Sequence, residues 1–128
     1  GDAVKPEDTH SVTALNVKSI IVSPEQGATL KSSPVLRGVA WSGQADIVKV
    51  EVSTDDGMSW QTASLGSEHA KYAWRLWTYH WKPNKSGDYT VLSRATDSLG
   101  RTQPAVAEWN PSGYLYNAYD QVKVHVEA

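Results

Sequence analysis

The sequence predicts an all-β protein, an immunoglobulin-like antiparallel β-sandwich of about seven strands. Short runs in which apolar and polar residues alternate are separated by turn residues, a pattern typical of half-buried strands. No run shows a sustained apolar pattern of helical period. The chain has 128 residues and no cysteine, so the disulfide hallmark of true immunoglobulin domains is missing. The sandwich prediction therefore depends on the strand pattern alone.

Residues 1–14 are polar and charged and show no periodicity, which predicts a flexible arm or the remnant of a linker. A single domain is expected over 15–128, because a chain of this length can bury one core. In its first strand, Ile20 and Val22 alternate with polar neighbours until Pro24 breaks the run. The next strand is expected over 35–41.

A hairpin is predicted in the middle of the chain. Val48, Val50 and Val52 are expected on one face of a strand, with polar residues on the other. Asp55-Asp56-Gly57 follows, and Gly accepts the positive φ that a tight turn requires. The chain then returns as a strand from Met58 to Leu65.

Two further strands show the same alternation. Tyr89, Val91 and Ala95 alternate within 88–96, and three valines alternate with charged or polar residues at the end of the chain: Val122, Val124 and Val126.

The segment 72–81 is an aromatic strand with large side chains on both faces. One face carries Tyr72, Trp74, Leu76, Thr78 and His80, and the other carries Ala73, Arg75, Trp77, Tyr79 and Trp81. A sandwich strand normally has one core face and one wet face. A loop or the terminal arm could cover the second face, or another subunit or domain could do so, because exposed apolar patches mark interfaces. We expect the interface at Arg75, Trp77, Tyr79 and Trp81.

The role of Arg75 has two interpretations. A buried guanidinium would need a carboxylate or carbonyl partner, and it could stack on a tryptophan. Alternatively, its stem packs on the strand and its head lies in water.

Composition excludes several classes of function. The formal net charge is −2, which argues against nucleic-acid binding, and no run is long enough to span a membrane. Without cysteine the chain has no thiol nucleophile, iron–sulfur cluster or cysteine-ligated zinc. The four histidines are too far apart in sequence to indicate a metal site. We predict no catalytic residue and no metal ligand in this chain.

Two polar segments have competing interpretations. Asp97 could be a catalytic carboxylate, but the following Ser98-Leu99-Gly100 favours a turn that it closes by accepting backbone N–H bonds. The segment 109–117 combines aromatic rings with side-chain amides. It is suited to lining a pocket or packing on another surface, and equally to a crossover that completes the core.

The order of several short motifs resembles the dimerisation domain of the sulfite-oxidase family of molybdenum oxidoreductases. The resemblance extends from about Val17 to Val126. Its motifs are Gly38-Val39-Ala40-Trp41-Ser42-Gly43; Val50 to Gly57 with Trp60; Ala73-Trp74-Arg75-Leu76-Trp77; Arg94-Ala95-Thr96-Asp97 with Gln103-Pro104; and Trp109-Asn110 with Gly113. Each motif is weak alone, and their order makes the resemblance specific.

The resemblance implies an immunoglobulin-like domain that forms homodimers and contributes to the rim of a substrate pocket. The rim residues it implies are Trp109, Asn110, Ser112 and Gly113. The molybdenum cofactor, a molybdopterin, would belong to a separate catalytic domain, since its protein ligand in this family is a cysteine. The intact enzyme would oxidise sulfite or a related sulfur compound and pass electrons to cytochrome c or haem. Bacterial relatives suggest a periplasmic setting.

Ser112 departs from the family pattern. Animal and plant sulfite oxidases carry an arginine at the matching position, where it helps to bind the anionic substrate. Serine has no charge and cannot replace the bidentate grip of arginine on an oxyanion. The departure favours a relative with another sulfur substrate. A stand-alone extracytoplasmic binding or adhesion module, using exposed tryptophans to bind carbohydrate, is the alternative function.

Overall fold

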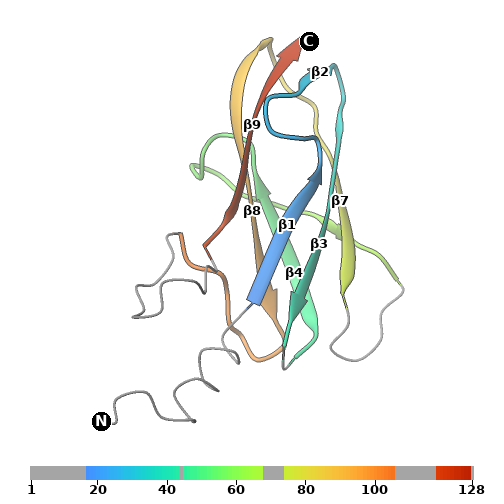
Figure 1. Cartoon of the computed structure of the whole chain (residues 1–128), viewed down its shortest axis with the longest axis vertical. Coiled ribbons are helices and arrows are strands. Elements are labelled where there is room, and N and C mark those ends of the chain that lie inside the picture. The colour runs from blue at the N-terminus through green and yellow to red at the C-terminus, as the bar shows by residue number, and fades with distance from the viewer. Residues whose placement is uncertain (1–16, 44, 68–73, 106–117, 128) are drawn as a thin grey trace.

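The computed structural model describes residues 17–43, 45–67, 74–105 and 118–127, and these form a two-layer β-sandwich (Figure 1). Their strands are β1 (Val17–Ser23), β2 (Thr29–Lys31), β3 (Val35–Ser42), β4 (Ile47–Ser53), β5 (Gln61–Thr62), β6 (Ser64–Leu65), β7 (Arg75–His80), β8 (Gly87–Asp97) and β9 (Asp120–Glu127). The predicted all-β class and sandwich are confirmed. The arm predicted over 1–14 lies outside the described residues.

One sheet has four strands in the order β1-β3-β7-β6, and the other has five in the order β2-β9-β8-β4-β5. The larger sheet is mixed, because β2 pairs in parallel with β9 while its other pairs are antiparallel. Figure 1 shows that β1 begins at the end of the sandwich where β8 finishes, whereas β9 finishes at the opposite end. We call the end with the start of β1 the lower end.

The core lies between the two sheets and is built from alternate residues of each strand. Its largest member is Trp77, which is 1% exposed. The alternation predicted for the last strand is confirmed, since Val122, Val124 and Val126 are buried and their neighbours in β9 are not. Burial of a large apolar side chain contributes roughly 1.5–3 kcal/mol.

The predicted inward face of β1 is wrong, and that of β4 is wrong at Val48 but confirmed at Val50 and Val52; irregular pairing accompanies each departure. In β1 the buried residues are Val17, Ser19 and Ile21, while Val22 is exposed where the pairing with β3 shifts register. In β4 a register shift between Ile47 and Lys49 coincides with the exposure of Val48. A bulge adds one residue to one strand and re-aims the side chains beside it.

The predicted return strand from Met58 to Leu65 is divided between the two sheets. β5 pairs with β4 in the larger sheet, and β6 pairs with β7 in the smaller one. Buried Ala63 lies between them, so the chain crosses from one layer to the other at that residue. The turn before this segment contains Asp56 at φ 61° and Gly57 at φ 93°, which confirms the predicted positive φ at Gly57.

Candidate interaction surfaces

Strand β7 alternates as predicted, but its two faces have different environments from those expected. Trp77 and Trp81 are buried in the core of the single chain, at 1% and 5% exposure, and Tyr79 is half-buried. Trp74 and Leu76 on the opposite face are 60% and 64% exposed. The interface role of the four predicted residues stays a prediction, and the rings available to a partner lie on the other face.

Gly38 explains how the indole of Trp77 fits between the layers. The two residues are register partners on β3 and β7. A Cβ atom at Gly38 would lie 2.3 Å from a carbon of the Trp77 ring and 2.1 Å from the backbone oxygen of Ile20. No real Cβ tolerates such contacts, so only glycine allows the ring to lie against β3. Trp77 Nε1 then donates a hydrogen bond to the Val39 oxygen at 3.3 Å.

Arg75 has the carbonyl partners that a partly buried guanidinium needs. Its two terminal nitrogens donate to the oxygens of Ile47 at 3.2 Å and Gly66 at 2.7 Å. Its Nε is buried without a hydrogen-bond partner in the described part of the chain. These bonds fix the first residue of β7 to the start of β4 and to the end of β6, which is a structural role within the single chain.

The outer side of the four-stranded sheet carries an apolar surface that we call the aromatic face, made by Ile20, Val39, Trp41, Trp74 and Leu76. Ile20, Val39 and Leu76 are register neighbours across β1, β3 and β7. Trp41 and Trp74 stack beside them with ring centroids 5.1 Å apart and planes at 19°. The stacked rings and Leu76 give this layer a contiguous apolar surface that reaches solvent.

The outer side of the five-stranded sheet carries a different group, the arginine cluster, made by Glu51, Trp60, Arg94 and Tyr119. Arg94 Nε bonds Glu51 Oε1 at 2.8 Å, and one terminal nitrogen donates to the Tyr119 hydroxyl at 3.1 Å. The guanidinium carbon lies 3.9 Å from the centroid of the Trp60 ring. Trp60 and Tyr119 meet edge to face at 5.0 Å. Burial opposes protonation, but the bonds to Glu51 and Tyr119 outweigh it and raise the Arg94 pKa.

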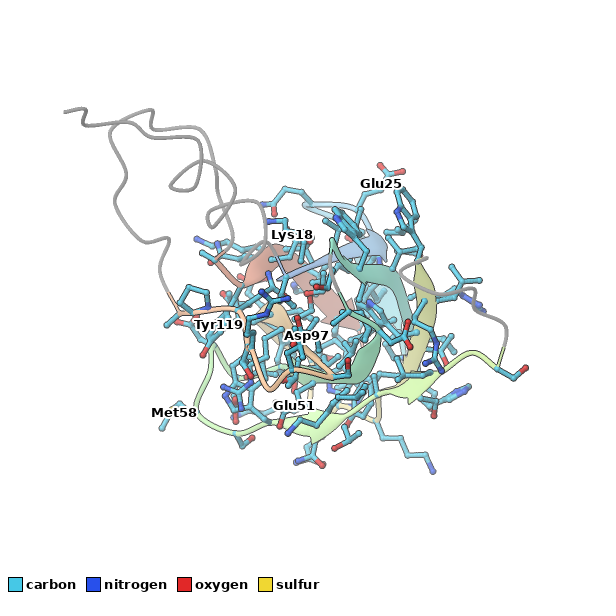
Figure 2. All side chains as sticks on the ribbon, turned by 90° about the horizontal axis from the view of Figure 1, so that it is seen from below. Lys18, Glu25, Glu51, Met58, Asp97 and Tyr119 are labelled. Atoms are coloured by element: carbon cyan, nitrogen blue, oxygen red, sulfur yellow. The ribbon has the colours of Figure 1, made fainter. Side chains whose placement is uncertain are left out.

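Asp97 joins the two sheets at the lower end, where Figure 2 shows it toward the middle of the sandwich. Its Oδ2 accepts hydrogen bonds from Ser42 Oγ of β3 at 3.0 Å and Arg101 Nε at 2.9 Å. Its Oδ1 accepts from the backbone nitrogens of Leu99 and Arg101, both at 3.0 Å. Burial opposes ionisation, but the bonds from Arg101 and Ser42 outweigh it and hold the pKa of Asp97 below its ordinary value. The predicted turn-closing role is therefore confirmed.

A second polar link is centred on Gln103, a motif residue for which the sequence predicted no structural role. Gln103 is 2% exposed, and its Oε1 accepts hydrogen bonds from Ser19 Oγ at 2.7 Å and the Ala95 nitrogen at 2.9 Å. Its Nε2 donates to the Ala118 oxygen at 2.9 Å. The link thus joins β1, β8 and Ala118, two residues before β9. Its only sequence signal was a serine at an inward position of β1.

The predicted rim residues Trp109, Asn110, Ser112 and Gly113 lie outside the described residues. The residues on either side of that segment are described and are held together. Tyr119 N donates to the Pro104 oxygen at 3.1 Å, beside the Gln103–Ala118 bond. The residues that flank the segment 106–117, which we call its roots, are therefore held at one place next to the arginine cluster.

No catalytic or metal-binding arrangement emerges from the part of the chain that the structure describes. Within those residues, His, Asp and Glu form no group of three that could hold a metal ion, and no helix is long and apolar enough to cross a membrane. The sequence also contains no cysteine to bind molybdenum as a thiolate.

A groove of about 510 Å³ lies at the upper end, between the β4–β5 turn and the β7–β8 connection. Its one described carboxylate is Asp55, which is already engaged. Asp55 accepts hydrogen bonds from Ser59 Oγ at 2.6 Å and Ser53 Oγ at 2.7 Å. These bonds lower the pKa of Asp55 to about 2. The turn role predicted for Asp55 is confirmed.

A family model described as the Mo-co oxidoreductase dimerisation domain matches residues 9–127, and the chain belongs to this family. Mitochondrial sulfite oxidase of Drosophila melanogaster is 35% identical over 98% of this chain and 25% of its own length. The enzyme of Macaca fascicularis is also 35% identical, with the same two coverages.

Among solved structures, the sulfane dehydrogenase SoxCD from Paracoccus pantotrophus is similar, with a TM-score of 0.69 and 26% sequence identity. The match covers 89% of this chain and 33% of the SoxCD chain. This chain therefore spans about a quarter of the curated relatives it matches and a third of the structural one.

Proposed function

We propose that this domain forms homodimers through the aromatic face and supports the catalytic domain of a molybdenum oxidoreductase. The observation that carries the proposal is the apolar surface of stacked Trp41 and Trp74 with Leu76, on a layer whose other face is buried. Exposed apolar patches of this kind mark protein interfaces. A two-fold contact uses the same patch on both subunits, and an apolar patch can meet its own copy without desolvating charge.

In the intact enzyme, Trp109, Asn110, Ser112 and Gly113 would line the rim of the substrate pocket, and the separate domain would hold the molybdopterin. The fixed roots of 106–117 support this role, because they give that segment a defined starting point. The proposed reaction is oxidation of sulfite or a related sulfur compound, with cytochrome c or haem as electron acceptor. A periplasmic setting rests on the resemblance to bacterial enzymes alone.

Sedimentation velocity of the 128-residue chain tests self-association directly. We expect a dimer at low micromolar concentration, and a monomer when Leu76→Glu places a charge in the aromatic face. Leu99→Glu is the matched control, because Leu99 is equally exposed at 63% but lies outside that face. A wild-type monomer that binds glycans would replace the proposal with a carbohydrate-binding adhesion module.

Ser112 supplies a test of the pocket role. Grafting Ser112→Arg into an intact parent enzyme should tighten sulfite binding, because a guanidinium can bind two oxygens of the anion at once. The expected result is a lower KM for sulfite, measured by steady-state kinetics, with Ser112→Lys as a control for charge without the bidentate geometry. An unchanged or higher KM for the arginine variant would count against a rim position for residue 112.

A further inference from the structure

We infer that the arginine cluster is the surface on which the molybdenum-cofactor domain docks, which leaves the aromatic face for the second copy of this chain. The inference rests on the proposed function, which gives this domain two partners. The two surfaces lie on opposite outer faces of the sandwich, so both partners can bind at once.

The cluster is a fixed surface. Arg94 is held at its Nε by Glu51, at a terminal nitrogen by Tyr119 and on its flat face by Trp60. A side chain already fixed in this way loses little rotamer entropy when a partner covers it. Arginine, tryptophan and tyrosine are also the residue types that dominate binding energy at protein interfaces. The cluster therefore has the composition and rigidity of an interface centre.

Chain connectivity assigns the partner. Tyr119 belongs to the cluster and comes two residues after the segment 106–117, which contains all four proposed rim residues. The bonds from Tyr119 to Pro104 and from Gln103 to Ala118 fix both roots of that segment beside the cluster. Both roots of the segment proposed to reach the catalytic domain therefore lie beside Trp60 and Arg94, which supports docking at the cluster.

Charge argues in the same direction. If two copies of the cluster met near a two-fold axis, two Glu51–Arg94 ion pairs would lose solvent together without gaining a new partner, and removing an ion pair from water is unfavourable. The five residues of the aromatic face are themselves uncharged. A separate domain can instead present acceptor groups, and we expect backbone carbonyl or carboxylate oxygens opposite Arg94.

The length of the relatives also supports a surface on which a further domain docks. The match to Drosophila melanogaster sulfite oxidase covers only 25% of that protein, so most of a comparable enzyme lies outside this domain. A stable contact between domains buries several hundred Å² on each side. The arginine cluster with exposed Met58 at its edge is the described surface next to the roots of 106–117 that can begin such a contact (Figure 2).

The test separates the two surfaces by mutation. The probe is the molybdopterin-binding domain from the same genome, produced as a separate cofactor-loaded chain, and its affinity for this domain is measured by biolayer interferometry. Arg94→Leu and Trp60→Ala should each weaken that affinity about 30-fold, as expected for an interface centre. Tyr119→Phe, which removes only the hydroxyl, should weaken it less. All three variants should remain dimers in sedimentation velocity, with thermal melts confirming that they are folded.

Trp74→Ser and Leu76→Ser are the matched controls on the opposite face. They should abolish the dimer and leave the affinity of each monomer for the molybdopterin-binding domain within about twofold. Unchanged affinity in the Arg94 and Trp60 variants would overturn the inference while leaving the proposed dimer intact. Loss of affinity in the Trp74 and Leu76 variants would reverse the assignment. A wild-type chain that neither dimerises nor binds the probe would refute the proposed function itself.

Discussion

The two outer faces of this sandwich differ in what their large side chains contact. On the four-stranded sheet, Trp41 and Trp74 stack on each other, and Trp74 and Leu76 are mostly exposed to solvent. On the five-stranded sheet, Trp60 lies under the Arg94 guanidinium, which is also bonded to Glu51. The aromatic face has exposed apolar surface that a partner could cover. The arginine cluster already has its charges paired within the chain.

This difference shows why a count of aromatic residues does not locate an interface. Trp77 and Trp81 have rings as large as Trp74, but they fill the core of the single chain. An interface is indicated by a ring that points out of the sandwich and by the side chains that lie beside that ring. Outward rings with apolar neighbours favour a copy of the same surface, whereas rings that support a charge favour a polar partner.

The largest effect is expected at Asp97, because both sheets and therefore both faces depend on it. Asp97→Asn removes the charge that pairs with Arg101 at 2.8 Å and weakens the link to Ser42. Breaking a buried pair by changing one partner costs about 3 kcal/mol or more. Urea unfolding at neutral pH should show this loss, with Asp88→Asn as a control that makes the same change at an exposed position of β8.

The same variant should change how the free energy of unfolding depends on pH under acidic conditions. The pKa of Asp97 is lowered in the folded protein, so its stabilisation is present above the unfolded value of about 3.9 and is lost as pH falls through the folded value. The difference between wild type and Asp97→Asn should therefore shrink below about pH 4. A difference that stays constant from pH 7 to pH 2 would show that the ionised carboxylate is not the source.

The next effect is expected beneath the aromatic face alone. Gly38→Ala introduces a Cβ that overlaps the Trp77 ring and the Ile20 oxygen, so β1, β3 and β7 must shift. Overpacking of this severity costs about 3 kcal/mol. We expect weaker dimerisation as well as lower stability, and unchanged affinity at the arginine cluster in the fraction that remains folded. Gly66→Ala is the control, because its nearest neighbour would be 3.5 Å away.

A smaller loss is expected within the five-stranded face. Arg94→Leu removes the bond to Glu51 and the cation over Trp60, both of which are partly exposed. Partly exposed pairs of this kind contribute about 1 kcal/mol, so thermal unfolding should shift by a few degrees. If the variant unfolds, the cluster is part of the structural core, and the contrast between the two faces would be wrong.

The smallest effect is expected at the β4–β5 turn beside the cluster. The Asp55 pKa of about 2 lies below its unfolded value, so this carboxylate stabilises the fold above about pH 4 and stops doing so as pH approaches 2. Asp55 is exposed, and solvent screening limits the gain to well under 1 kcal/mol. An NMR titration of the Asp55 carboxyl should give a pKa below its ordinary value, and Ser59→Ala should raise it. A titration near 4 in the wild type would contradict the hydrogen bonds to Ser59.

Much of the fold could be predicted because local alternation determines it. The three valines of β9 and the turn at Gly57 followed from period-two burial and from the need for positive φ. Val48 and Val22 were assigned to the wrong side because a register shift between paired strands is not encoded in either strand alone. The same limit applies to the crossover at Ala63, which depends on two partners distant in sequence.

The candidate surfaces were only partly predictable for a related reason. Glu51 and Arg94 each alternate with buried neighbours, so their outward positions could be predicted from the sequence. Their pairing across β4 and β8 could not. Trp77 could be assigned to the core only with knowledge that Gly38 lies opposite it. Ser19 and Gln103 are 84 positions apart, and nothing local indicates that they share a hydrogen bond.

The use of the aromatic face for self-association is tested most directly by isotope-filtered NOE spectroscopy. Equal amounts of ¹³C-labelled and unlabelled chain are mixed, and only contacts between two copies give signals. Intermolecular NOEs from the methyl groups of Ile20 and Leu76, with none from the Met58 methyl, are the predicted result. Intermolecular NOEs at Met58 and the arginine cluster, with none at Leu76, would contradict the account.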